Sequence, residues 1–65
     1  DKMKIRKNSI VRLNYQFDNA VVTVDDFGID DDDGDGNDRP VIDFKLEDGN
    51  EYYAYFDQIS RVVKY

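Results

Sequence analysis

The sequence predicts an all-β fold of five short antiparallel strands arranged as a small barrel. Apolar and polar residues alternate along residues 9–17 and along the two halves of residues 39–56, which is the period of half-buried strands. No segment carries the 3.6-residue apolar period of a helix of ten or more residues. A chain of 65 residues supports one small core, so we expect a single β-barrel-like domain over residues 3–65.

The first two strands are expected to follow one another closely. In residues 9–17, every second side chain from Val11 onward is apolar, which places these side chains on one face. Asp18 and Asn19 come next, and both residue types tolerate a positive φ, so they predict a tight turn. Residues 20–27 are rich in β-branched side chains and are expected to return as the second strand.

Residues 39–56 predict a hairpin whose register follows from its turn. If Glu47, Asp48 and Gly49 form a three-residue loop, Gly49 supplies the left-handed position and the apolar side chains of both strands share one face. A two-residue turn of Asp48 and Gly49 would scatter these side chains, so we prefer the first register. It pairs Lys45 with Glu51, Phe44 with Tyr52 and Ile42 with Ala54.

The rest of the chain completes the expected fold. Residues 56–60 lack alternation, which indicates one 3₁₀ turn with Asp57 as its cap. Residues 61–65 would form the last strand, and residues 28–39 would form a long acidic loop. This succession of elements over residues 9–65 resembles the SH3-like and Sm-like small β-barrels. The resemblance implies a fold, but such folds serve many functions.

The composition favours binding over catalysis. The chain has no cysteine and no histidine, so it lacks a thiolate nucleophile, the commonest general base and the commonest transition-metal ligand. Acid–base catalysis by a carboxyl group needs a pocket that raises its pKa, which an exposed glycine-rich loop does not supply. We therefore expect no enzymatic activity and no cofactor.

Two features bear on where the protein acts. No apolar run approaches the roughly 20 residues of a membrane span, and the absence of cysteine fits an intracellular chain. We expect a cytoplasmic protein, which would act in the host-cell cytoplasm if a phage encodes it. Asp1 and Lys2 precede Met3 and have the character of a tag remnant.

The net charge of −6 is concentrated in one segment. Residues 25–38 hold eight acidic residues and no basic one, whereas the remaining residues hold nine basic and seven acidic ones, a balance of +2. Residues 2–7 are basic. Such a charge dipole can orient a domain on a charged partner.

One interpretation of the acidic segment is a calcium-binding β module. Residues 31–36 match the first half of an EF-hand-type loop, in which alternate carboxylates converge on the ion. The match is incomplete, because Ile42 stands where the bidentate glutamate is required and strands are expected on both sides. The ligands in this alternative are Asp31, Asp33 and Asp35, completed by Asp25, Asp26 or Asp38.

The preferred interpretation is mimicry of nucleic-acid charge. An extended chain advances about 3.3 Å per residue, close to the roughly 3.4 Å between charges along one DNA strand. Residues 30–33 therefore offer a similar linear charge density. In acidity, small size and tyrosine content the chain resembles the small inhibitors of phages and mobile elements, including anti-restriction and anti-CRISPR proteins. The resemblance implies a protein partner with a basic nucleic-acid-binding surface. The net charge of −6 argues against a direct nucleic-acid ligand.

The hairpin adds two tyrosines to the candidate surface. Tyr53 and Tyr55 are expected on the face opposite the core, and exposed tyrosines are good interface anchors. A third interpretation makes them the binding surface of an SH3-like recruitment domain, with the acidic loop merely solvated. The candidate partner-binding residues are Asp25, Asp26, Asp30, Asp31, Asp32, Asp33, Asp35, Asp38, Tyr53 and Tyr55.

Overall fold

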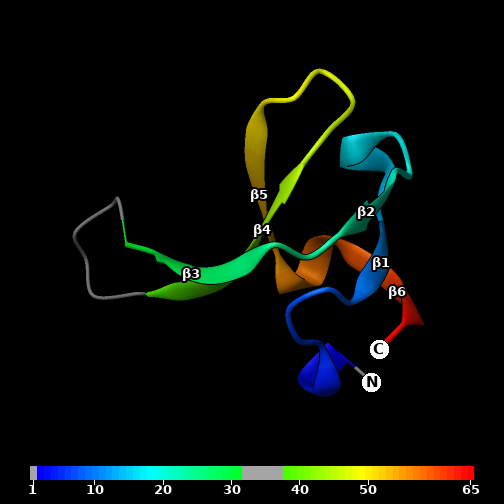
Figure 1. The fold of residues 1–65 in the computed structure, drawn as a ribbon. Helices are drawn as coiled ribbons and strands as arrows, with labels where there is room; N and C mark the ends of the chain where they lie inside the picture. Colours follow the sequence, from blue (N-terminus) through cyan, green and yellow to red (C-terminus); the bar gives the residue numbers. More distant parts are fainter. Residues whose placement is uncertain (1, 32–37) are drawn as a thin grey trace.

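Two antiparallel sheets of three strands each build the protein (Figure 1). The computed structural model describes residues 2–31 and 38–65. The first sheet has the order β2-β1-β6, formed by β1 (Ile10–Leu13), β2 (Val21–Thr23) and β6 (Ile59–Lys64). The second has the order β3-β4-β5, formed by β3 (Asp26–Asp30), β4 (Arg39–Lys45) and β5 (Glu51–Tyr55). The described residues also form three 3₁₀ turns. η1 (Lys2–Lys4) precedes β1, η2 (Tyr15–Phe17) follows it, and η3 (Phe56–Gln58) lies between β5 and β6.

The all-β expectation is confirmed, but the prediction of five strands in a barrel is wrong. The described residues form six strands, in two sheets that do not close into a barrel. The extra strand arises because the second expected strand divides into β2 and β3. The amide of Val24 donates to Ser9 in the first sheet and the next amide, of Asp25, donates to Asp43 in the second, each at 2.8 Å. The chain therefore changes sheets between these two residues.

The first strand is shorter than its alternation predicts. β1 ends at Leu13 because the side-chain oxygen of Asn14 accepts a hydrogen bond from the Gln16 amide at 3.0 Å and so starts η2. Tyr15, expected on the core face, is consequently 77% exposed. The turn prediction is confirmed, since Asp18 and Asn19 have φ values of 54° and 57°.

The predicted hairpin register is confirmed at every pair. Lys45 lies opposite Glu51, Phe44 opposite Tyr52 and Ile42 opposite Ala54. Gly49 takes the left-handed position with a φ of 80°.

The structure shifts the expected boundaries on both sides of this hairpin. The connection expected over residues 28–39 is shorter, because β3 continues to Asp30 and pairs there with Arg39, the first residue of β4.

The 3₁₀ turn before the last strand is confirmed as η3, but the prediction of Asp57 as its cap is wrong. Tyr55 occupies the cap position, and its amide donates to the side-chain oxygen of Gln58 at 2.9 Å. β6 then begins at Ile59, two residues earlier than expected.

The core lies between the two sheets. Its centre is Phe44, which packs edge-on against Phe17 at 5.6 Å and stacks on Tyr52 at 6.2 Å between ring centroids. The other fully buried apolar side chains are Val11, Leu13, Val24, Ile42, Ala54 and Ile59. Full burial of a Val, Leu, Ile or Phe side chain stabilises the folded state by roughly 1.5–3 kcal/mol. Each such residue therefore supplies a large share of the stability of so small a domain.

One polar side chain is buried among the described residues. Ser9 accepts a hydrogen bond from the amide of Arg6 at 3.0 Å and donates one to the carbonyl of Tyr65 at 3.1 Å. It therefore joins the segment before β1 to the segment after β6. In the described part of the chain no helix has the length and apolarity needed to cross a membrane.

Candidate functional site

The candidate site is the face of the second sheet that points away from the core. Residues directly opposite one another in an antiparallel pair share a face. Asp26, Asp43 and Tyr53 therefore form one row across β3, β4 and β5. On the same face, Tyr55 lies two residues further along and Asp30 lies four residues further along. We call these five residues the acid–tyrosine face.

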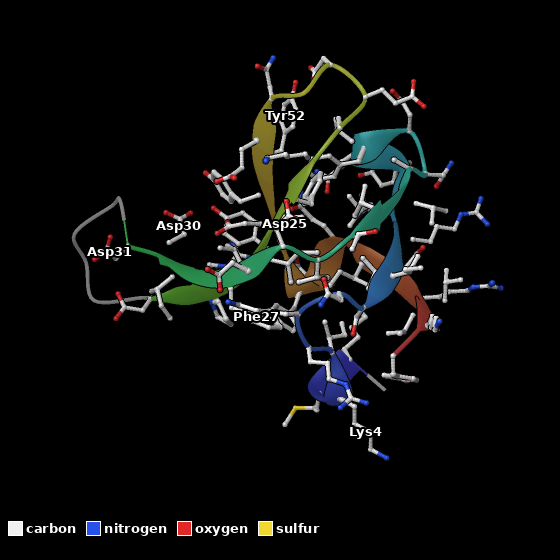
Figure 2. The ribbon with its side chains drawn as sticks, in the orientation of Figure 1. Lys4, Asp25, Phe27, Asp30, Asp31 and Tyr52 are labelled. Carbon is white, nitrogen blue, oxygen red and sulfur yellow. The ribbon has the colours of Figure 1, made fainter. Side chains whose placement is uncertain are left out.

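The opposite side of the β3–β4 hairpin is apolar. Phe27 alternates with Asp26, and Figure 2 shows Phe27 and Asp30 on opposite sides of the ribbon. The Phe27 ring stacks on Phe56 of η3, with 6.4 Å between centroids. This contact fixes which side of the hairpin turns inward and which side carries the carboxylates.

Tyr53 and Tyr55 cover the middle of the acid–tyrosine face. Their rings meet edge-on at 5.9 Å and 85°. Val41 lies opposite Tyr55 on this face, and only 5% of it is exposed although it is outside the main core. Tyr53 is itself 49% exposed. The two rings thus form a packed platform that still presents aromatic surface to solvent.

Tyr55 is held by a small charged network. Its hydroxyl donates a hydrogen bond to the carboxylate of Asp30, and this bond together with desolvation raises the pKa of Tyr55 to about 12. The guanidinium carbon of Arg39 lies 3.7 Å above the Tyr55 ring, a cation–π contact. Arg39 also pairs with Asp57 of η3 at 3.1 Å. Tyr55 is therefore a positioned residue, whereas Tyr53 is the more accessible one.

The side chains in the row of Asp26, Asp43 and Tyr53 are held by fewer contacts than Tyr55. Asp26 accepts a hydrogen bond from the amide of Phe27 at 2.8 Å. Its carboxylate also meets the ammonium group of Lys7 at 3.8 Å, with both side chains at least 60% exposed. Exposed pairs of this kind are worth about 0–1 kcal/mol, so Lys7 can exchange for another cation at little cost.

The other predicted acidic residues lie around this face. Asp25 is exposed directly before β3, while Asp31 and Asp38 are exposed directly after β3 and directly before β4. Figure 2 shows Asp31 beyond Asp30 at the tip of the described strand. Asp32, Asp33 and Asp35 lie outside the described residues.

The ligands of the calcium alternative also lie partly outside the described residues. Asp31 is described, whereas Asp33 and Asp35 are not. Within residues 2–31 and 38–65, no three acidic side chains gather in a group able to hold a metal ion.

Three residues of this region were not among the predicted site residues. Asp43 joins the row of Asp26 and Tyr53, and the hairpin register already carried that signal because it set Asp43 opposite Tyr53. Arg39 and Asp57 are brought together by the orientation of η3 against β4. Sequence alternation carries no signal for such a contact, since it depends on how a turn packs on a sheet.

Comparison of the chain with protein-family models, with curated proteins and with solved structures finds no match.

Proposed function

We propose that the protein is a non-enzymatic binding protein, whose acid–tyrosine face and neighbouring acidic segment occupy a basic site on a partner protein. The observation that carries this proposal is the row of Asp26, Asp43 and Tyr53 across one exposed sheet face. It combines two carboxylates with an accessible aromatic ring. In the sequence, the segment 25–38 adds seven further acidic residues to Asp26.

The chemistry of this face suits arginine and lysine. A carboxylate accepts two hydrogen bonds from a guanidinium group, and the same group stacks on a tyrosine ring. Arg39 makes both kinds of contact within the chain, with Asp57 and with the Tyr55 ring. An arginine of a partner would meet the same kinds of group at Asp26, Asp43 and Tyr53.

The partner class follows from the charge density. Clustered carboxylates attract a surface built to hold phosphates, and salt weakens such a contact. We therefore favour a nucleic-acid-binding protein whose site this domain would block. The glycine-containing hairpin and the 3₁₀ turn before the last strand support the SH3-like resemblance in these two elements, whereas the six strands in two open sheets depart from it. That resemblance adds no ligand of its own.

The test uses two double variants, each of which controls for the other. Asp26→Asn with Asp43→Asn removes two charges from the acid–tyrosine face. Asp18→Asn with Glu47→Gln removes two charges beyond the other end of β4. Each variant and the parent protein are immobilised, and proteins captured from a bacterial lysate are quantified by mass spectrometry in the presence and absence of duplex DNA.

We expect the first double variant to lose on the order of tenfold in capture of a nucleic-acid-binding protein, since two charged contacts of about 0.7 kcal/mol each amount to that factor. The second variant should capture normally, and duplex DNA should release the partner. Equal capture by both variants, or capture that persists through duplex DNA and high salt, contradicts charge mimicry.

The two rival functions give different results in the same assay. A tyrosine-based recruitment domain, favoured by the exposure of Tyr53, would lose capture in Tyr53→Ala and keep it in the first double variant. A calcium module would lose capture with a chelator, and its melting temperature would rise with calcium but not with magnesium.

A further inference from the structure

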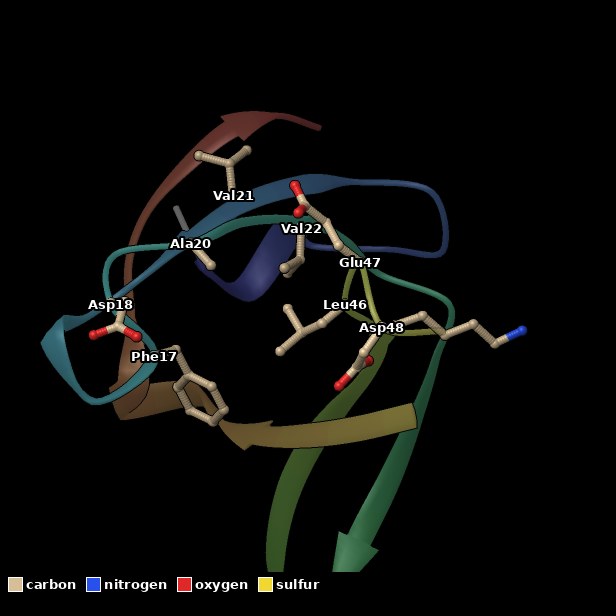
Figure 3. A pocket seen from close by; sticks show the side chains of 9 residues that line it. Phe17, Asp18, Ala20, Val21, Val22, Leu46, Glu47 and Asp48 are labelled. Carbon is tan, nitrogen blue, oxygen red and sulfur yellow. The ribbon is translucent and has the colours of Figure 1, made fainter. Parts of the chain in front are cut away.

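A groove lies at the other end of β4, remote along that strand from the acidic segment. Its volume is about 460 Å³, and it is bounded by η2, the start of β2 and the β4–β5 turn (Figure 3). The floor is apolar and is formed by Phe17, Ala20, Val22 and Leu46. In Figure 3 the Leu46 side chain points across the groove toward Phe17 and Val22. We call this feature the β2 groove.

The rim of the β2 groove is acidic. Asp18 stands on one side, Glu47 and Asp48 stand on the other, and Lys45 is the single basic residue of the lining. The Tyr52 hydroxyl and the Asn50 amide both donate hydrogen bonds to Asp48, and they hold the pKa of its carboxyl below the usual 3.8. The rim therefore places three acidic side chains around an apolar floor.

One wall of the groove is an open strand edge. β2 is the outer strand of its sheet, and in the described part of the chain no strand pairs with its free side. The hydrogen bonds from Leu13 to Ala20 and from Val24 to Ser9 fix which residues of β2 face β1. By the alternation of an antiparallel ladder, the backbone N–H and C=O groups of Val21 and Thr23 point away from β1.

We propose that the β2 groove binds an extended basic segment of a partner protein. The segment adds to the free edge of β2 as a further strand. It places one apolar side chain on the floor formed by Phe17 and Leu46. Its lysines or arginines meet the carboxylates of Asp18, Glu47 and Asp48. This site goes beyond the function proposed above, because it uses none of the residues of the acid–tyrosine face.

Charge complementarity selects this occupant over others. Lys45 is one cation beside three rim carboxylates, so an acidic or neutral peptide would leave a surplus of negative charge at the rim. A rounded ligand would leave the β2 edge unpaired. An extended basic peptide can pack an apolar side chain on the floor, pair its cations with the rim carboxylates and form hydrogen bonds with the β2 edge. It also needs no rearrangement of the hairpin, since Asp48 is already oriented by Tyr52 and Asn50.

The probe is a labelled peptide of sequence Arg-Lys-Val-Leu-Val-Lys-Arg, titrated against the whole protein by fluorescence anisotropy. Two control peptides are matched to it. One replaces the four basic residues with glutamate. The other keeps every side chain but is N-methylated at alternate peptide bonds, which removes strand pairing without changing charge. Amide shifts in ¹H–¹⁵N spectra then locate the bound peptide.

We expect the basic peptide to bind and to shift the amides of Val21, Thr23 and Leu46 most. The glutamate peptide should not bind, and N-methylation should weaken binding about tenfold or more, which corresponds to the loss of one or two hydrogen bonds. Asp18→Asn with Glu47→Gln should weaken it by a similar factor. Asp26→Asn with Asp43→Asn, which carries the same change of net charge, should leave it within about twofold.

Two results would overturn the proposal. Equal binding of the N-methylated peptide would mean that charge alone holds it, with no added strand. Larger shifts around Tyr53 than around Val21 would place the peptide on the acid–tyrosine face. Because the two double variants have opposite expected effects here and in the capture assay, each proposal can fail without the other.

Discussion

The hydroxyl of Tyr55 ties the last residue of β5 to the last residue of β3. The carboxylate of Asp30 accepts a hydrogen bond from it, while the guanidinium of Arg39 covers the Tyr55 ring and also pairs with Asp57. The sequence indicated that Tyr55 and Asp30 belong to one surface, and the structure brings them into contact. It also makes both less available than Tyr53, because each already has a partner inside the chain.

This contact has a consequence at high pH. The pKa of Tyr55, about 12, lies above the ordinary 10, so the folded state holds the proton more tightly than the unfolded state does. The stabilisation is complete below pH 10 and is lost as the pH rises toward 12. In an absorbance titration of the five tyrosines, we expect a component that ionises near pH 12 and disappears in Tyr55→Phe.

The control for this titration is Asp30→Asn. It keeps an acceptor for the hydroxyl but removes the charge, so the late component should move toward pH 10. A late component that is unchanged by Tyr55→Phe would show that another tyrosine produces it. The pKa of Tyr52 is also raised by its bond to Asp48, so Tyr52→Phe serves as a second comparison.

At the scale of elements, the β4–β5 turn has the clearest basis in sequence. Gly49 has a φ of 80°, and an added Cβ would meet nothing within 4 Å. Any loss of stability on adding a side chain there therefore comes from backbone strain at the positive φ and not from a steric clash. Gly28 in β3 is the converse case. Its φ is not in the left-handed range, and a Cβ would make ordinary contacts with Val41 at 3.4 Å and Asp43 at 3.8 Å.

These two glycines give a matched prediction. Gly49→Ala should destabilise the protein by about 1 kcal/mol, because an alanine is strained at positive φ. Gly28→Ala should be neutral or stabilise it by a few tenths of a kcal/mol, because the unfolded chain loses freedom. Urea unfolding of both variants measures the difference. A larger loss in Gly28→Ala would mean that Val41 cannot accommodate the extra methyl group.

The elements also show where sequence reasoning holds and where it stops. The hairpin register could be predicted because a one-residue slip would have moved Phe44 and Ala54 off the core face. The early end of β1 could not, since alternation continues through Tyr15 while Asn14 caps a 3₁₀ turn instead. The division of the expected second strand into β2 and β3 could not be predicted either. It depends on Val24 and Asp25 donating to different sheets, and the pattern of side chains is the same either way.

Over the whole molecule, charge is distributed unevenly between the two ends of β4. The described carboxylates of Asp26, Asp30, Asp31 and Asp38 lie on or directly beside the β3–β4 hairpin, and the rim of the β2 groove adds three at the opposite end of β4. The acidic segment could be found from the sequence, because it is continuous. The groove could not, because Asp18 and Glu47 are brought together only by folding.

This distribution predicts how salt affects stability. Repulsion among the acidic residues is screened as the Debye length falls from about 10 Å at 0.1 M salt to about 3 Å at 1 M. The melting temperature should therefore rise with sodium chloride, by roughly 4–8 °C for each 1 kcal/mol gained. The gain should shrink when Asp31, Asp32 and Asp33 are replaced with asparagine, which leaves the Asp30–Tyr55 contact in place.

Calorimetry in the presence of a chelator separates this effect from metal binding. If the asparagine variant gains as much from salt as the parent does, the acidic segment is not the source of the repulsion.

The position of β1 has a kinetic consequence. β1 lies between β2, which follows it closely in the chain, and β6, which comes from the far end. The second sheet, in contrast, forms entirely from strands that succeed one another. Closing a long loop costs more entropy than closing a short one. The β3-β4-β5 meander can therefore assemble early, while the arrival of β6 at β1 completes the native state. Until then the buried side chains of β1 stay uncovered, and this is the interval in which the chain is most exposed to aggregation.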